Sequence, residues 1–195
     1  MEQIKKMEKT NSKRLVTTAL FAAMTCVATM IIKFPTPTFG YIHIGDCFVL
    51  LSGVILGPYT GALAAGVGSM LADMFAGYLS FAPATLIVKA LTAFAAGLLF
   101  RITKKAFHTK RSRYAAVAIG GFIGETIMVI GYFLYEAGVA AFGGGGFTAA
   151  ALAAGITASA AGIPFNIVQG VSGILLSIIL LPLLAKIPDV REWMG

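Results

Sequence analysis

Long apolar segments follow one another along this 195-residue chain, and the longest match the roughly twenty residues that a helix needs to cross a lipid bilayer. The segment from Pro164 to Pro182 carries no charged residue, and the segment from about Tyr114 to Tyr135 carries one. Charged residues make up only 12% of the chain, about half the share found in soluble domains. The pattern predicts an all-α integral membrane protein that crosses the cell membrane several times.

Six segments are expected to cross the bilayer as transmembrane helices, at about residues 14–32, 46–57, 60–78, 83–100, 114–135 and 164–182. The second is only about a dozen residues long, so we expect it to be short or tilted. Basic residues gather in residues 1–13, in residues 101–113 and near the C-terminus, whereas the opposite loops hold only Lys33. This asymmetry predicts that both termini are cytoplasmic.

Three parts of the chain follow from this topology. Residues 1–13 are expected to form a cytoplasmic lead or a short interfacial helix, because they are too polar to fold alone. Residues 14–187 form the membrane domain, and residues 188–195 form a cytoplasmic tail. Pro35 and Pro37 are expected to end the first helix and to force an extended connection.

Several classes of function are excluded by what the sequence lacks. The formal net charge is +7, but the basic residues lie at the ends of apolar segments and form no patch with interleaved aromatics, so no nucleic-acid partner is predicted. The sequence contains no GxxxxGK[ST], HExxH or GxSxG motif and no Cys/His cluster. We therefore expect no enzyme, no cofactor and no metal, and energy for any transport must come from an ion gradient or another polypeptide.

The stretch FGYIHIGDCFVLLSGVIL, residues 39–56, places Tyr41, His43 and Asp46 directly before the second helix. Ionisable groups at a bilayer boundary are costly to hold, and in an apolar chain they mark a ligand site by default. The outward-facing loop that holds them is therefore predicted to form one edge of a binding pocket. His43 on its own is equally consistent with a hydrogen-bonding role within the loop.

Other polar residues are expected to lie near this edge of the pocket. At 1.5 Å per residue, Lys89 and Gln169 lie roughly 9 Å inside the outer boundary of the membrane. Asp73 and Glu125 lie roughly 18–20 Å above the cytoplasmic boundary of a core about 30 Å thick. All four fall in the outer half, and a buried structural ion pair such as Asp73 with Lys89 is the alternative. The predicted substrate-binding residues are Tyr41, His43, Asp46, Asp73, Lys89, Glu125, Tyr132, Asn166 and Gln169.

Two segments of the chain are rich in small residues. The first helix carries small residues at helical spacing, which serve either internal packing or docking onto a separate subunit. These residues are Thr18, Ala19, Ala22, Ala23, Cys26 and Thr29. The segment from Gly138 to Gly162 is rich in Gly and Ala, so we expect a mobile outer loop with at most a short helix. Its run from Gly143 to Gly146 could cover the opening of the pocket.

The order of these features resembles a known family of membrane proteins. The features are an Ala-rich first helix, YIHIGD before a short second helix, GPYTG before the third, a lone lysine in the fourth and GIPFN opening the sixth. Over about residues 14–187 the chain resembles the substrate-binding S component of energy-coupling factor (ECF) transporters, in the branch that includes riboflavin, pyridoxine and hydroxymethylpyrimidine carriers.

The resemblance implies a vitamin-binding site near the outer face and three partner chains. These are a transmembrane coupling subunit and two cytoplasmic ATPases, and the S component topples in the membrane to release the vitamin inside. Contact with the coupling subunit maps onto Ala19, Ala22 and Ala23. The pocket maps onto the outer loop and helices four to six, at His43, Asp46, Lys89, Tyr132, Asn166 and Gln169.

The ligand is expected to be a small aromatic heterocycle with hydroxyl groups, since rings and a few polar groups would recognise it. Pyridoxine or another B6 vitamer, or hydroxymethylpyrimidine, is favoured, with riboflavin as the alternative. A self-sufficient ion-coupled secondary carrier is a further alternative, in which Asp73, Lys89 and Glu125 would relay an ion. Such carriers usually contain an internal repeat, and no convincing match between the two halves of the chain is seen.

Overall fold

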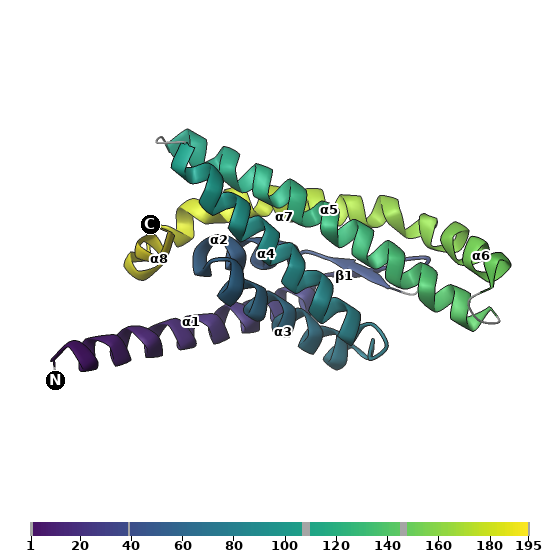
Figure 1. The fold of residues 1–195 in the computed structure, drawn as a ribbon, viewed down its shortest axis with the longest axis horizontal. Coiled ribbons are helices and arrows are strands. Elements are labelled where there is room, and N and C mark those ends of the chain that lie inside the picture. The colour runs from purple at the N-terminus through teal and green to yellow at the C-terminus, as the bar shows by residue number, and fades with distance from the viewer. Residues whose placement is uncertain (1, 39, 107–109, 145–147, 195) are drawn as a thin grey trace.

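A computed structural model describes residues 2–38, 40–106, 110–144 and 148–194 of the chain. Figure 1 shows helices running along one long axis, with a short antiparallel ribbon between them. The elements in chain order are α1 (Glu2–Ile31), β1 (Lys33–Pro35), β2 (Tyr41–His43), α2 (Asp46–Leu56), α3 (Pro58–Ala76), α4 (Ala82–Ala106), α5 (Lys110–Gly143), α6 (Ala149–Ser159), the 3-10 turn η1 (Ala160–Gly162), α7 (Ile163–Leu184) and α8 (Pro188–Met194).

Helix α2 is the centre of the bundle. It is apolar on all sides, and every residue in it except Phe48 is buried. A helix with this pattern belongs in a protein core, and α2 packs against α1, α3, α4 and α7. Its 11 residues span only about 16 Å at 1.5 Å per residue. The prediction of a short second helix is therefore confirmed.

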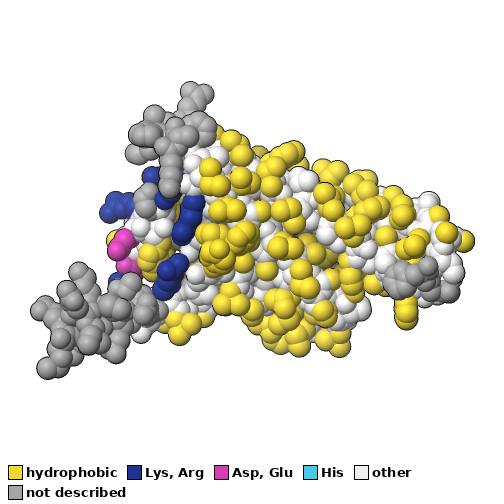
Figure 2. Space-filling model, viewed as in Figure 1, with side chains coloured by type: hydrophobic (Ala, Val, Ile, Leu, Met, Phe, Trp, Pro, Cys, Tyr) yellow, Lys and Arg dark blue, Asp and Glu magenta, His cyan; other side chains and the backbone are white. Residues whose placement is uncertain are grey.

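Charge and apolar surface are separated along the long axis. Figure 2 shows Lys and Arg side chains gathered at the end of the molecule where Figure 1 draws both termini, while hydrophobic side chains cover most of the remaining length. Among the described residues, four helical segments are long and apolar enough to cross a membrane: Ser12–Ile31, Ala82–Lys104, Arg113–Gly143 and Ala149–Leu184. The chain is therefore an all-α, multi-pass membrane protein, apart from the two three-residue strands.

Both ends of the chain contain more helix than expected. Helix α1 begins at Glu2, so residues 2–13 continue the first apolar helix instead of forming a separate element. Residues 188–194 form α8, and its Val190 and Met194 are buried in a cluster with Leu56 and Phe100. The predicted tail therefore covers the core at the end of the bundle that carries the termini.

The short helix allowed between Gly138 and Gly162 is present as α6, but the expectation of a mainly mobile loop was wrong, because residues 138–143 and 149–162 are helical. Helix α5 continues to Gly143, and α6 occupies Ala149–Ser159, with the Thr148 hydroxyl accepting a hydrogen bond from the Ala151 N–H at its start. The small residues serve packing here, because a Cβ at Gly155 would lie 2.5 Å from the Ala137 carbonyl oxygen. The predicted cover at Gly143 to Gly146 lies partly outside the described residues.

The small residues of α1 face in two directions. Thr18, Cys26 and Thr29 are buried inside the bundle. Ala22 lies against α3, where a Cβ added at Gly68 would overlap the Ala22 carbonyl oxygen. Ala19 and Ala23 are exposed on the outer face of the helix. Only part of the predicted stripe is therefore used within this chain.

The contact between α1 and α3 can be tested with a matched pair of substitutions. We expect Gly68→Ala to lower the free energy of unfolding by about 1–3 kcal/mol, because the added methyl overpacks the helix contact. Gly138→Ala is the control, since its Cβ would meet nothing within 4 Å and alanine favours the helix. Thermal unfolding in detergent measures both. Equal melting temperatures for the two variants would contradict the close approach of α1 and α3.

Candidate functional site

The β1–β2 ribbon brings Tyr41 and His43 to the ends of the surrounding helices. Its antiparallel register pairs Lys33 with His43 and Pro35 with Tyr41. The extended connection predicted from the prolines is therefore confirmed. The Tyr41 hydroxyl donates a hydrogen bond to Asp73 Oδ1 at 2.6 Å, which joins the ribbon to the end of α3.

The turn between the ribbon and α2 is tightly enclosed. A Cβ added at Gly45 would overlap the Thr29 hydroxyl of α1 and lie 2.9 Å from His43 Nδ1. The Gly45 N–H donates a hydrogen bond to this same Nδ1 at 3.0 Å. A glycine is therefore required here for the turn to fit beneath α1, which gives the YIHIGD stretch a structural reason.

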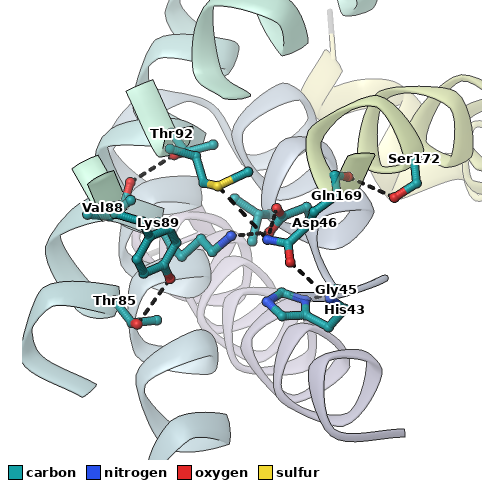
Figure 3. A network of polar contacts seen from close by, with 12 residues as sticks. His43, Gly45, Asp46, Thr85, Val88, Lys89, Thr92, Gln169 and Ser172 are labelled. Atoms are coloured by element: carbon teal, nitrogen blue, oxygen red, sulfur yellow. Dashed lines mark hydrogen bonds and ion pairs between the residues drawn. The ribbon is translucent and has the colours of Figure 1, made fainter. Parts of the chain in front are cut away.

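A buried ion pair lies at the centre of the site. Lys89 Nζ is 2.5 Å from Asp46 Oδ1, and both side chains are 0% exposed. Figure 3 shows the two side chains meeting between α4 and α2. Lys89 Nζ also lies 5.3 Å from the centre of the Tyr132 ring. The alternative of a buried ion pair is therefore present, but with Asp46 as the partner of Lys89 instead of Asp73.

Gln169 of α7 connects this ion pair to the ribbon. Its Nε2 donates to Asp46 Oδ2 at 2.7 Å, and its Oε1 accepts from the His43 backbone N–H at 2.9 Å. Figure 3 shows the amide between the carboxylate and the ribbon. One amide thus satisfies a buried carboxylate oxygen and a buried backbone donor, as interior polar groups require. The network joins β2, α2, α4 and α7.

A small cavity of about 20 Å³ lies among these elements. That volume holds about one water molecule. Six of the nine predicted site residues line it: Tyr41, His43, Asp73, Tyr132, Asn166 and Gln169. Asp46 and Lys89 are absent from the lining but support it through Gln169 and Tyr132. These eight polar residues therefore lie close together, as the prediction from their positions along the helices required.

Glu125 is the predicted residue that lies apart from the cavity. It is buried at 4% exposure, it packs against Gly170 and Gly173 of α7, and its carboxyl group interacts with Asp46 and Lys89. It lines an apolar groove of about 320 Å³ between α5 and α7. A Cβ added at Gly173 would lie 2.9 Å from Asp46 Cβ and 3.4 Å from Glu125 Oε1, so Glu125 lies beside the ion pair although it does not line the cavity.

Four further side chains in the lining were missed from the sequence: Thr36, Phe81, Thr85 and Glu136. The Thr85 and Tyr132 hydroxyls are 3.0 Å apart. Thr85 precedes Lys89 by four residues and Glu136 follows Tyr132 by four, so each shares a helix face with a predicted residue. Helical spacing could have identified these two, whereas nothing in the local sequence indicates Thr36 or Phe81.

Burial sets the protonation of the two ribbon residues. It lowers the pKa of His43 to about 4, against the raising effect of the Asp46 carboxylate. The imidazole is therefore neutral at physiological pH, as its Nδ1 acceptor role requires. Burial and the neighbouring Asp73 raise the pKa of Tyr41, so its phenol remains a donor. Within the described residues, no group of three or more His, Cys, Asp or Glu side chains could hold a metal ion.

Fold and site together define a class: a multi-pass membrane protein with a small polar cavity among its helices. Over residues 9–186 the chain matches the family described as "ECF-type riboflavin transporter, S component". The chain belongs to this family, so it is a transporter S component and not an enzyme.

Two individual proteins are also similar to this chain. The fold is similar to a solved structure described as "Structure and mechanism of the S component of a bacterial ECF transporter", with a TM-score of 0.59 and 23% identity, covering 90% of this chain and 97% of that one. A Pyrococcus woesei protein described as "Uncharacterized protein in gap 3'region" is 36% identical over 107 residues, or 54% of this chain. The match covers 66% of that relative's length.

The buried ion pair predicts a specific pattern of stability. Lys89→Met leaves the Asp46 carboxylate buried without a cation, which should cost about 3–5 kcal/mol of unfolding free energy. Adding Asp46→Asn removes the unpaired charge and keeps an oxygen that can accept from Gln169. The double variant should therefore regain a large part of the lost unfolding free energy. Thermal unfolding in detergent measures this, with exposed Lys186→Met as the control. A double variant less stable than Lys89→Met alone would contradict the pairing.

Proposed function

We propose that this chain is the subunit of an ECF importer that binds riboflavin from outside the cell. Membership of the riboflavin-type family favours this vitamin over the B6 vitamers and hydroxymethylpyrimidine that the sequence alone favoured. The observation that carries the proposal is the small cavity, in which aromatic rings converge from the ribbon, from Phe81 and from α5, and amide groups converge from α7. Few convergent polar groups within an apolar scaffold are typical of small-molecule sites.

Each kind of lining residue has a proposed task. The rings of Tyr41, Phe81 and Tyr132 supply flat contact area for an aromatic ring system. The Asn166 amide can both donate and accept, which suits a flavin ring that carries both types of group. Asp46 and Lys89 are proposed to hold Gln169 and Tyr132 in place without touching the ligand.

The cavity must widen to accept a vitamin. Its volume of about 20 Å³ is far below the roughly 300 Å³ at which ligand pockets begin. Its walls belong to separate elements, and the ribbon is held to the helices by the Tyr41–Asp73 and His43–Gln169 hydrogen bonds. We propose that ligand entry moves the ribbon relative to α3 and α7.

The proposed topology has six membrane spans, α1 to α5 and α7, with both termini in the cytoplasm. It is supported by the basic end in Figure 2, which also carries the termini. The 34 residues of α5 span about 51 Å, which exceeds a hydrocarbon core about 30 Å thick. We therefore place the outer turns of α5, together with α6, above the hydrocarbon on the extracellular side.

A transmembrane coupling subunit and two cytoplasmic ATPases are the proposed partners. The sequence has no P-loop of its own, so nucleotide hydrolysis must occur in other chains. Ala19 and Ala23 are exposed on α1, and small exposed side chains let another membrane helix approach closely. Ala22 is already used against Gly68, so we assign the partner contact to Ala19 and Ala23.

The ion-coupled carrier alternative has less support. Its relay would need Asp73, Lys89 and Glu125 in one path, but Asp73 bonds Tyr41 and Lys89 pairs with Asp46. Glu125 lies beside the Asp46–Lys89 pair, but it does not line the cavity that Asp73 lines. The arrangement favours a binding subunit.

Ligand binding can be tested at Asn166. We expect purified wild-type protein to bind riboflavin in a calorimetric titration, and Asn166→Leu to weaken binding by about tenfold or more, because about 1–3 kcal/mol of polar contact is lost. Val168→Ala is the control, since Val168 is on the same helix and 60% exposed toward lipid. Tight binding of pyridoxine or hydroxymethylpyrimidine but not riboflavin would contradict the proposed substrate.

The partner contact can be tested at α1. Ala19→Trp and Ala23→Trp should leave riboflavin affinity unchanged and prevent co-purification with the coupling subunit and its ATPases, because the indole blocks close helix approach. Ala115→Trp, at an exposed alanine on α5, should leave both properties unchanged. Intact complexes with both α1 variants would rule out this face as the partner contact.

A further inference from the structure

An open groove lies at the basic end of the molecule, between the end of α4 and helix α8, and its volume is about 600 Å³. Figure 2 shows Lys and Arg side chains gathered at this end. The groove is lined by three apolar side chains and two cations: Leu98, Ile102, Trp193, Arg101 and Lys104. No acidic residue of the described part of the chain lines it. It shares no residue with the polar cavity, so it is separate from the proposed vitamin site.

Both cations are held in place by the fold. A Cβ added at Gly57 would overlap the Arg101 guanidinium, so this group lies against the turn between α2 and α3. Lys104 Nζ donates a hydrogen bond to the backbone carbonyl of Met194, which joins the end of α4 to α8. Among the described residues, Arg101 forms no ion pair with a carboxylate. Its planar guanidinium can therefore donate two hydrogen bonds to a phosphate group.

The apolar side of the groove continues along α4 toward the middle of the membrane. Four exposed apolar residues of α4 are spaced by four or seven positions, which places them on one helix face. These residues are Ile87, Leu91, Leu98 and Ile102. The apolar segment of α4 that can cross a membrane ends at Lys104. The lipid-facing side of α4 thus leads into the groove where the hydrocarbon is expected to end, and Trp193 is of the residue type enriched at that boundary.

We propose that this groove binds an anionic phospholipid. Arg101 and Lys104 donate to the phosphate oxygens of the headgroup, Trp193 packs beside the glycerol region, and an acyl chain lies along the exposed face of α4. Basic pockets between membrane helices on the cytoplasmic side bind such headgroups, and this end of the molecule is the one proposed to be cytoplasmic. A dissolved anion would use the two cations but leave Leu98 and Ile102 uncovered, whereas a lipid covers both kinds of side chain.

The test compares two lipids in three proteins. Native mass spectrometry of detergent-purified protein, titrated with phosphatidylglycerol or phosphatidylcholine, gives a Kd for each lipid. We expect wild type to bind phosphatidylglycerol about tenfold more tightly or better, which corresponds to about 1.4 kcal/mol. Arg101→Gln should reduce this preference at least about fivefold. Lys186→Gln removes an exposed cation outside the groove, so it should leave the preference unchanged.

Ile102→Glu provides a second test if Arg101→Gln does not fold. Ile102 is 58% exposed, so little packing is lost, and a carboxylate beside Arg101 should repel the anionic lipid and remove the preference. Equal Kd values for the two lipids in wild type, or an equal loss of preference in Lys186→Gln and Arg101→Gln, would overturn the site.

Two further outcomes would assign the groove to another occupant and overturn the proposal. Displacement of phosphatidylglycerol by excess inorganic phosphate would indicate a site for a dissolved anion. Loss of co-purification with the coupling subunit in Arg101→Gln, with the lipid preference intact, would indicate a contact with protein. Riboflavin affinity should be the same in wild type and all three variants, because the groove and the polar cavity have no residue in common.

Discussion

The Asp46–Lys89 ion pair is the interaction on which the rest of the site depends. Two charges removed from water and lipid headgroups are stable only when each is paired and hydrogen-bonded. Lys89, Gln169 and the fully enclosed start of α2 meet this requirement for Asp46. Because the pair joins α2 to α4 and its amide partner joins α7 to the ribbon, satisfying one carboxylate positions three walls of the cavity.

Small residues organise the remainder of the protein in two ways. Inside the bundle, glycines bring backbones together, as where a Cβ at Gly53 would overlap the Ala93 carbonyl oxygen of α4. In lipid such close approach supplies much of the attraction between helices, because apolar side chains gain little by leaving hydrocarbon. On the outside, Ala19 and Ala23 leave the same kind of surface unused. The exposed alanines of α1 would thus let a partner helix pack as closely as the helices inside this chain do.

Much of the architecture could be predicted from the sequence, because apolar length and helical rise depend on local composition. Counting residues predicted that α2 is short and that the polar residues of several helices lie in the outer half of the membrane. The two prolines predicted the extended ribbon. The partner of Lys89 was not predicted, since counting placed Asp73 inside the membrane with Lys89 and Asp46 at the outer boundary, whereas the folded chain pairs Lys89 with Asp46. The short helix allowed between Gly138 and Gly162 is present as α6, but the extent of helix there was underestimated because its packing against α5 cannot be read from a Gly/Ala-rich sequence. The binding role of the lining residues stays a prediction.

The most direct measurement is an experimental structure of the purified protein with riboflavin bound. The account predicts ring density in contact with Tyr41, Tyr132 and Asn166, a cavity widened between the ribbon and the helices, and an Asp46–Lys89 pair that is intact and not touched by the ligand. Density for the flavin in the groove between α5 and α7, or an ion pair broken so that Lys89 contacts the ring, would contradict it.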